Sequence, residues 1–324
     1  MKTLFNIDWC RGDMLVIMGP TASGKTAFAV SVAREVNRCC KEGLLPYKGC
    51  EIISADSRQV YRNMTIGTGK DLAEYAEVPY HLIDIAEAGE KYDLFRYKKD
   101  FQEVYKNLRG RNVFPILCGG SGLYIEAVCK DYALREVAPD TELRQKLEQK
   151  SMEELIDMLT VLKKEHGSEP HNNTDFDTKK RVIRAIEIEL SQGADNGGRT
   201  MEDAEYEKIA PKRIKYLALA PDREIRNKRI DARLEARLCE GMVEEVRALL
   251  ERGIKAEDLI YYGLEYKFIT QYLTGEISYD YMKEHLAIAI HQFAKRQMTW
   301  LRGMERRGIE IEWLPSAVNN DERK

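Results

Sequence analysis

The first 130 residues alternate short apolar runs with longer amphipathic segments. The apolar runs cover residues 14–18, 51–55, 78–85 and 113–118. Between them, residues 26–41 favour a helix, and residues 95–109 carry apolar side chains at helical spacing. Buried strands that alternate with helices are typical of a parallel sheet covered by helices on both faces. The pattern therefore predicts an α/β core.

Beyond residue 130 the pattern changes, because residues 131–192 are highly charged and contain no strand candidate. Helices are predicted at residues 143–149, 152–166 and 179–190, followed by a linker rich in Gly and Asn at 191–198. An apolar run at 214–220 returns the chain to the sheet, and long helices are predicted up to residue 239 and over 282–307. We therefore expect a core domain formed by residues 1–130 and 205–324, and an all-helical insertion domain at 131–204.

The first predicted strand runs into a glycine-rich loop with the sequence G-P-T-A-S-G-K-T, which matches G-x-x-x-x-G-K-[ST] between a strand and a helix. Backbone N–H groups, the lysine and the helix start all favour a di- or triphosphate, and the core is expected to resemble that of P-loop NTPases. The predicted phosphate-binding residues are Gly19, Pro20, Thr21, Ala22, Ser23, Gly24, Lys25 and Thr26. The Thr26 hydroxyl is also an expected Mg²⁺ ligand. The loop alone leaves the phosphate compound open, and an ordinary Gly-rich turn is the alternative.

Asp56 follows the second predicted strand directly. Ligands of open α/β sheets collect at the carboxyl ends of the strands, so Asp56 could face the phosphate loop. A helix N-cap is the alternative, and one Asp can do both. The strand at 113–118 ends in Gly119-Gly120-Ser121-Gly122, whose glycines permit close backbone approach to a ligand or to another loop.

Two helices carry unusual groups of basic residues. Arg226, Arg229, Arg233 and Arg237 recur every three or four residues and therefore share one helix face. Such a stripe suits a pyrophosphate or a nucleic-acid backbone, and a solvated basic face is the alternative. The helix at 179–190 begins with Lys179, Lys180, Arg181 and Arg184, which opposes the helix dipole and indicates either a binding role or a solvated face.

Composition narrows the class of protein. The formal net charge is −3 with 32% charged residues, so a nucleic-acid site would require basic residues segregated on one face. The seven cysteines form no C-x-x-C pair, which argues against a zinc site or a disulfide framework. The sequence has no signal-peptide pattern and no apolar stretch of about 18 residues. A cytoplasmic protein without a membrane segment is expected.

Several motifs together resemble one family closely. They are G-P-T-A-S-G-K-T, D-S-R-Q-V-Y, H-L-I-D, G-G-S-G-L-Y-I, K-R-V-I-R-A-I-E, G-E-I-S-Y-D and A-K-R-Q-M-T-W-L-R, in this order between residues 14 and 303. The set is similar to that of the tRNA dimethylallyltransferases, also called tRNA isopentenyltransferases, of bacterial type. The resemblance implies transfer of a dimethylallyl group from its pyrophosphate to N6 of the adenine at tRNA position 37, next to the anticodon. It also implies Mg²⁺, a monomer, and a helical insertion that grips the anticodon stem-loop.

The resemblance gives individual residues expected roles. The phosphate loop would hold the donor pyrophosphate, with Thr21 at the oxygen that bridges to the allylic carbon. Arg229 would neutralise the departing pyrophosphate, with Arg233 as the second choice, and Asp56 would bind the adenine amine as general base. The residues expected to read the flipped base are Ser57, Arg58, Gln59 and Ser121. Those expected to contact the rest of the RNA are Arg144, Lys180, Arg181 and Arg184.

Two segments differ from the usual family sequence. Residues 67–71 read G-T-G-K-D where many relatives have G-T-A-K-P, and residues 262–268 read Y-G-L-E-Y-K-F where they have a G-Y-K/R-E-like segment. Three alternatives to tRNA prenylation stay open. They are prenyl transfer to a free adenine nucleotide, a small-molecule kinase that uses ATP at the phosphate loop, and a non-catalytic, nucleotide-dependent RNA-binding module.

Overall fold

The structure is a computed structural model that describes residues 5–132, 137, 139–166, 176, 178–192 and 206–315. The chain divides into two compact units, one formed by Met1–Tyr132 with Ile209–Lys324 and the other by Ala133–Lys208. The insertion expected from the sequence was 131–204. Each unit is described by itself.

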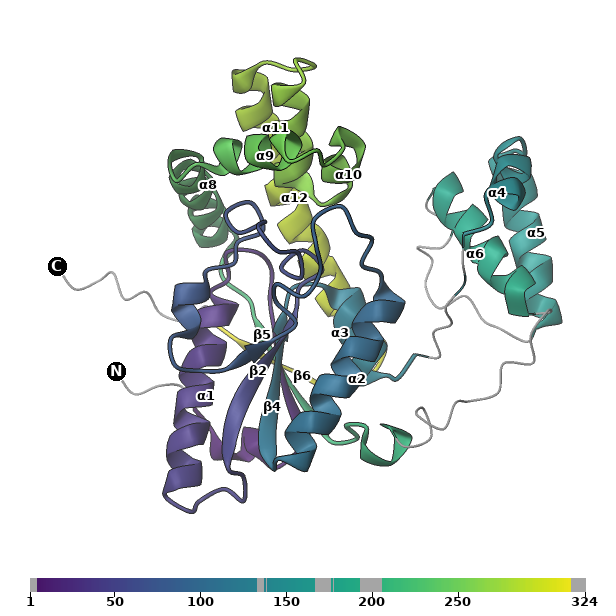
Figure 1. Cartoon of the computed structure of the whole chain (residues 1–324). Helices are drawn as coiled ribbons and strands as arrows, with labels where there is room; N and C mark the ends of the chain where they lie inside the picture. The colour runs from purple at the N-terminus through teal and green to yellow at the C-terminus, as the bar shows by residue number, and fades with distance from the viewer. Residues whose placement is uncertain are drawn as a thin grey trace. The chain divides into compact units, whose positions relative to one another are not determined.

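The described strands of the larger unit form one parallel sheet (Figure 1). Its order is β3-β2-β4-β1-β5-β6. The strands are β1 (Met14–Met18), β2 (Gly49–Ala55), β3 (Tyr80–His81), β4 (Val113–Gly119), β5 (Ile214–Leu219) and β6 (Ile311–Leu314). The predicted α/β class is confirmed.

Helices cover both faces of this sheet, which explains why its central strands are continuously apolar. Helix α1 (Lys25–Lys41) lies on one face, where its buried apolar residues pack against side chains such as Ile17, Ile52 and Ile116. Helices α2 (Leu94–Gly110) and α3 (Gly122–Cys129) lie on the other face (Figure 1). There, the Tyr97 hydroxyl of α2 donates a hydrogen bond of 3.1 Å to the carbonyl oxygen of Ser54 in β2.

The strand predicted over residues 78–85 is wrong in length, because β3 contains only Tyr80 and His81. Leu82 and Asp84 have φ angles of 61° and 55°, and this left-handed conformation ends the strand. Asp84 is held by an ion pair with the buried Lys70. His81 has a structural partner, since its Nε2 lies 2.6 Å from Oε2 of Glu51. The sequence pattern also missed the short strand β6.

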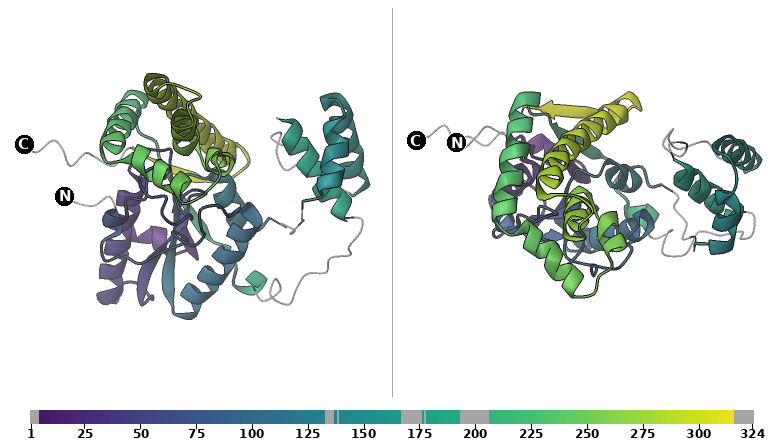
Figure 2. Two further views of the ribbon diagram at one scale, coloured as in Figure 1. Left: turned by 45° about the horizontal axis from the view of Figure 1, so that its top comes forward. Right: turned by 90° about the horizontal axis from the view of Figure 1, so that it is seen from above.

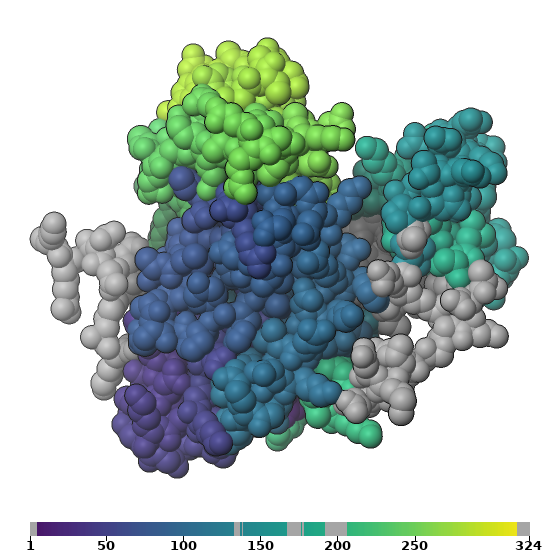
Figure 3. Space-filling view, in the orientation of Figure 1, coloured from purple at the N-terminus to yellow at the C-terminus, as the bar shows by residue number. Residues whose placement is uncertain are grey.

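The remaining helices of the larger unit gather at the edge where the strands end (Figures 1 and 2). They are α8 (Arg223–Cys239), α9 (Met242–Glu251), α10 (Ala256–Tyr261), α11 (Leu264–Leu273) and α12 (Tyr279–Arg306). Two short 3₁₀ helices, η1 (Ile7–Cys10) and η2 (Leu72–Tyr75), complete the unit. Figure 3 shows the segment containing α9 to α11 lying directly on the loops that follow β2. Tyr262, between α10 and α11, joins this segment to the loop between β3 and α2, because its hydroxyl accepts from the Gly89 amide at 2.7 Å and donates to the Glu90 carbonyl at 2.8 Å.

The smaller unit consists of helices among its described residues. Its main helices are α4 (Thr141–Glu148), α5 (Met152–Glu165) and α6 (Lys179–Gln192), which pack around Leu155, Leu159 and Ile186. Lys179 donates a hydrogen bond of 2.6 Å to the Glu148 carbonyl at the end of α4, so one basic residue at the start of α6 has a structural role. Across the described part of both units, no helix combines the length and apolarity needed to cross a membrane.

The contact between the ends of β2 and β4 predicts a large effect of replacing Gly119. A Cβ atom at Gly119 would lie 2.1 Å from the Ala55 carbonyl oxygen and 2.7 Å from the Ala55 Cβ. Gly119→Ala should therefore lower the free energy of unfolding by about 1–3 kcal/mol, measured by urea denaturation in reductant. The control is Gly110→Ala, because a Cβ there meets nothing within 4 Å. Equal stability of the two variants would contradict the expectation.

Candidate active site

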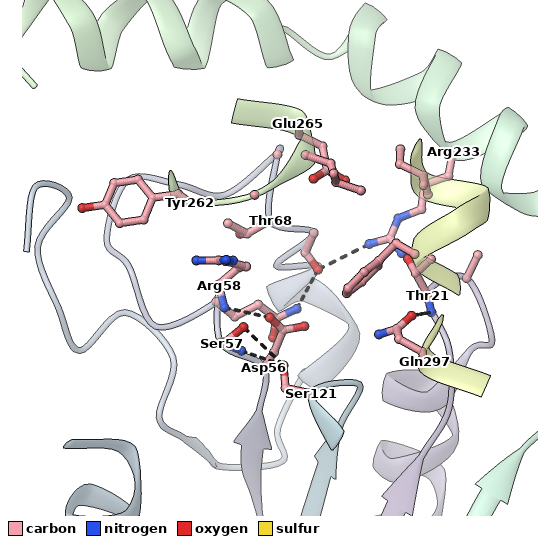
Figure 4. A pocket seen from close by; sticks show the side chains of 18 of the residues that line it. Thr21, Asp56, Ser57, Arg58, Thr68, Ser121, Arg233, Tyr262, Glu265 and Gln297 are labelled. Carbon is pink, nitrogen blue, oxygen red and sulfur yellow. Dashed lines mark hydrogen bonds between the residues drawn. The ribbon is translucent and has the colours of Figure 1, made fainter. Parts of the chain in front are cut away.

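A cavity of about 440 Å³ lies where the carboxyl ends of the strands meet the C-terminal helices. Its wall is formed by the phosphate loop, the residues after β2, the loop before η2, Ser121 and parts of α8, α11 and α12 (Figure 4). Segments far apart in the sequence therefore enclose one space of the size of a small-molecule site.

The phosphate loop has the backbone that its glycines suggested. Gly24 precedes α1 with a φ of 78°, a left-handed conformation that favours glycine. A Cβ at Gly19 would lie 2.7 Å from Ser23 Oγ and 3.1 Å from the Leu219 carbonyl oxygen. Among the described residues, the cavity is lined by Thr21, Ala22, Ser23, Gly24, Lys25 and Thr26, whereas Gly19 and Pro20 lie outside its lining. These two residues therefore belong to the loop but not to the surface that faces the cavity.

Lys25 is the cation at the base of the cavity. Burial lowers the pKa of its ammonium group, and the nearby charge of Asp56 opposes that effect. Its Nζ lies 3.5 Å from the Pro20 carbonyl oxygen. A bound phosphate would favour the charged form of Lys25, as would the other carboxylate side chains of the wall.

Asp56 lies in the cavity wall and also shapes the turn that follows β2. Its Oδ1 accepts a hydrogen bond of 2.9 Å from the Arg58 amide. Residues 57–60 form a turn and not a helix, so the helix-cap alternative is wrong and the cap is an Asx-turn. The site residues from β2 and β4 meet here, because Ser121 Oγ accepts from the Ser57 amide at 3.0 Å (Figure 4).

Arg58 and Gln59, which were predicted to read the base, both line the cavity. The Arg58 guanidinium carbon lies 5.5 Å from the centroid of the Tyr261 ring. Gln59 has internal partners at both ends of its amide, because Nε2 donates to the Gly69 carbonyl at 3.0 Å and Oε1 accepts from Ser54 Oγ at 3.4 Å. Gln59 therefore braces the wall of the cavity.

The arginine stripe of α8 reaches the cavity through Arg233. Figure 4 shows Arg233 in the cavity wall, whereas Arg229, the first choice from the sequence, is not among the lining residues. Arg226 and Arg237 are only 8% and 9% exposed, so the stripe is not a solvated face. Helical spacing places these arginines on one face, but only the packing of α8 decides which turn meets the cavity.

Gln297 of α12 is a site residue that the sequence pattern did not single out. Its Oε1 accepts a hydrogen bond of 2.8 Å from the Thr21 amide, and its Nε2 donates one of 2.9 Å to the Gly120 carbonyl. It thus ties the phosphate loop to the Gly-rich loop after β4. In the sequence, Gln297 is marked only by its place in the motif A-K-R-Q-M-T-W-L-R. The motif does not indicate which residues its amide contacts.

Two further carboxylates of the wall were also missed. Burial raises the pKa of Glu265, at the start of α11, and the nearby charge of Asp56 adds to this effect while Arg237 and Arg233 oppose it. Burial likewise raises the pKa of Glu74, with a contribution from Asp71. The cavity wall therefore contains both cations and carboxylates.

The predicted RNA-binding residues of the smaller unit fall into two pairs. Arg144 and Arg184 both bind the buried carboxylate of Glu187, the former through contacts of 3.0 and 2.7 Å. Lys180 and Arg181 are exposed at the start of α6. Arg144 and Arg184 therefore have a structural role, because they neutralise the buried Glu187 carboxylate between α4 and α6. Lys180 and Arg181 face solvent.

Within the described residues, no group of three or more His, Cys, Asp or Glu side chains could hold a metal ion. The Thr26 hydroxyl lines the cavity at the start of α1. One protein oxygen together with phosphate oxygens and waters is a usual arrangement for Mg²⁺. The residues present therefore fit a Mg²⁺ that arrives with a phosphate ligand.

The placement of the two arginines predicts unequal effects on anion binding. Arg233→Ala should raise the Kd for inorganic pyrophosphate at least about tenfold, because a charge-assisted hydrogen bond contributes about 1.5–3 kcal/mol. Arg229→Ala is the matched control, one helical turn away, and should change the Kd less than about twofold. Titration calorimetry measures both. A larger loss in Arg229→Ala would restore the original preference.

Comparison with known proteins gives a consistent picture. The family model described as IPP transferase matches residues 59–304. The chain is 50% identical over 315 residues to tRNA dimethylallyltransferase 1 of Parabacteroides distasonis, covering 96% of this chain and 95% of that protein. It is 50% identical over 314 residues to tRNA dimethylallyltransferase 1 of Porphyromonas gingivalis, covering 96% of each.

Solved structures agree with these relatives. The full-length tRNA isopentenylpyrophosphate transferase of Bacillus halodurans aligns with a TM-score of 0.65 and 28% identity, over 97% of this chain and 93% of that chain. A eukaryotic dimethylallyltransferase acting on tRNA aligns with a TM-score of 0.71 and 22% identity, over 94% and 74% of the two chains, which supports the fold. The match of the family model and the near full-length identity to its curated members place this chain in the IPP transferase family.

Proposed function

We propose that this protein transfers a dimethylallyl group from dimethylallyl pyrophosphate to N6 of the adenine at tRNA position 37, next to the anticodon. The observation that carries the proposal is one cavity lined by both a phosphate loop and the carboxylate of Asp56. The names of the relatives support tRNA as the acceptor. In the reaction, the N6 nitrogen forms a bond to the allylic carbon, the carbon–oxygen bond to pyrophosphate breaks, and N6 loses a proton.

The phosphate loop and Arg233 are suited to the leaving group. Pyrophosphate takes the electron pair of the broken bond, so cations and N–H donors that are already in place stabilise the charge that develops. Lys25 lies at the base of the cavity and Arg233 in its wall. The Thr21 amide is engaged by Gln297, which leaves the Thr21 hydroxyl as the group that would reach the bridging oxygen.

Asp56 is suited to the acceptor. The exocyclic amine of adenine is a weak nucleophile, so holding it in line with the allylic carbon contributes more than removing its proton. The carboxylate of Asp56 would accept a hydrogen bond from the amine and then its proton. The adenine must leave the anticodon-loop stack at a cost of a few kcal/mol. Ser57, Arg58 and Ser121 surround Asp56 and would contact the flipped base.

Mg²⁺ is part of the proposal as a cofactor that Thr26 and the donor pyrophosphate would hold. When bound, it supplies positive charge to the leaving group. In the smaller unit, Lys180 and Arg181 would contact RNA phosphates, while Glu187 orients Arg144 and Arg184 for the same purpose. A cytoplasmic monomer remains part of the proposal.

The decisive experiment is transfer of label from radiolabelled dimethylallyl pyrophosphate to unmodified tRNA, with AMP and ADP as competing acceptors. Label at the adenine beside the anticodon supports the proposal. Label in free nucleotide would instead establish a nucleotide prenyltransferase, and ATP-dependent phosphorylation without label would establish a kinase. Binding of tRNA and nucleotide without any reaction would establish a non-catalytic RNA-binding module.

Asp56 should be needed for transfer but not for donor binding. Asp56→Asn keeps the oxygen that accepts from the Arg58 amide but removes the charge and the base. We expect the single-turnover rate of transfer to fall about 100-fold or more, as for loss of a general base. The Kd for pyrophosphate should change less than about twofold. Loss of pyrophosphate binding would show instead that Asp56 acts on the donor or its metal.

Gln297 should be needed for a well-positioned phosphate loop. Gln297→Ala removes the acceptor of the Thr21 amide and the donor to Gly120. We expect kcat/KM to fall about three- to tenfold, the range for one or two neutral hydrogen bonds. Gln271→Ala is the control, because Gln271 lies on α11 and its side-chain amide bonds only the nearby Glu276 side chain among the described residues. Equal activity of the two variants would remove Gln297 from the site.

A further inference from the structure

The loop of residues 65–71, here called the 65–71 loop, is fastened to the C-terminal helices. The carboxylate of Glu245 on α9 accepts hydrogen bonds from the amides of Thr65, Ile66 and Gly67 at 2.7, 2.8 and 3.0 Å. The hydroxyl of Tyr266 on α11 donates to the same carboxylate at 2.6 Å. A carboxylate bound by successive backbone amides is a strong local anchor, so the start of this loop is fixed against α9 and α11.

The end of the loop is fastened to α8 by Asp71. Its Oδ2 lies 3.2 Å from Nη2 of Arg233, and its Oδ1 lies 3.2 Å from Nη2 of Arg237. Arg237 also donates to the Ile66 carbonyl at 2.5 Å. The side chain of Arg237 is 11% exposed and that of Arg233 is 34% exposed. Asp71 therefore links a buried arginine to one that reaches the cavity.

This arrangement of the two arginines requires a residue without a side chain at position 69. Gly69 has a φ of 71°, and a Cβ there would lie 2.2 Å from Nη2 of Arg233 and 2.8 Å from Nη1 of Arg237. The two guanidinium groups occupy the space that a side chain at position 69 would fill. Gly69 and Asp71 are also the positions at which the loop departs from the usual family sequence.

Two guanidinium groups this close repel each other unless an anion lies between them. Burial lowers the pKa of Arg237, the charge of Arg233 lowers it further, and the charge of Asp71 opposes both effects. Within the described residues, Nε and Nη1 of Arg233 have no hydrogen-bond partner, and Arg233 lines the cavity. Asp71 thus binds Nη2 of Arg233 and leaves Nε and Nη1 for a ligand.

We infer that Asp71 is a positioning residue that holds the guanidinium of Arg233 in the wall of the cavity, where it binds the donor pyrophosphate. The inference rests on the proposed pyrophosphate site. From charge alone, the carboxylate of Asp71 would be expected to weaken the binding of pyrophosphate, and we infer the opposite effect. A fixed arginine loses less conformational entropy on binding than a free one, so orientation outweighs the added negative charge.

A double-mutant cycle on binding of inorganic pyrophosphate tests this inference. Asp71→Asn keeps the shape of the side chain but loses the charge that holds both arginines. We expect the Kd to rise about three- to tenfold in the wild-type background and to stay unchanged in the Arg233→Ala background, since Asp71 acts through Arg233. The control is Glu77→Gln, which breaks the exposed pair with Arg34 and removes the same formal charge.

The outcomes separate the two levels of the proposal. An unchanged or tighter Kd in Asp71→Asn, or an equal loss in the Arg233→Ala background, overturns the role of Asp71 alone. Absence of pyrophosphate binding by the wild-type protein overturns the proposed site as well. In the transfer assay, Asp71→Asn should lower kcat/KM for the donor in the wild-type background but not in the Arg233→Ala background, a difference that a general loss of structure would not produce.

Gly69→Ala provides a second variant that leaves every charge in place. Its Cβ would displace Arg233 and Arg237, so the Kd for pyrophosphate should rise at least threefold, about as much as in Asp71→Asn. Gly43→Ala is the matched control, because Gly43 has a φ of 72° and a Cβ there meets nothing within 4 Å. It imposes the same backbone strain without touching an arginine. Equal pyrophosphate affinity in the two alanine variants would contradict the inference.

Discussion

The site depends on the parallel pairing of β2, β4 and β1 in register. In the register of the sheet, Gly119 of β4 lies beside Ala55 of β2 on one side and Met18 of β1 on the other, so the three strands end at one level. Each strand continues directly into a functional loop. Asp56, Ser121 and the phosphate loop are therefore brought together by the sheet itself, before any helix is added. This arrangement explains why the end of β4 needs a glycine, since the loops approach each other more closely than a Cβ atom permits.

The C-terminal helices close this open edge and supply what the sheet lacks. Gln297 binds the phosphate loop and the Gly-rich loop with one amide, and Arg233 adds a cation to the wall. Glu245 and Asp71 in turn connect these helices to the 65–71 loop. The contacts mostly involve charged groups or backbone amides, whose directional hydrogen bonds fix the positions of the loops more specifically than apolar packing does.

The two segments that depart from the usual family sequence contact each other in the structure. Tyr266 belongs to one of them, and its hydroxyl shares the Glu245 carboxylate with the amide of Gly67, which belongs to the other. The Tyr266 ring also fills the space beside Gly67, where a Cβ would lie 2.8 Å from the ring. The departures are therefore parts of one local structure, in which each segment completes the other.

The sequence by itself determined the α/β class, the phosphate loop and the place of Asp56 after β2, because these depend on local periodicity and on a motif with its own backbone requirements. Which arginine of α8 lines the cavity, the two contacts of Gln297 and the short β3 were decided only by the tertiary structure. A helical stripe specifies a face but not the turn that meets a neighbour, and an amide that bridges residues far away in the chain has no local pattern. Asp84, which has a left-handed backbone, likewise pairs with Lys70, a partner that no local pattern indicates. Local physics could place the loops, and only packing could show which side chains meet between them.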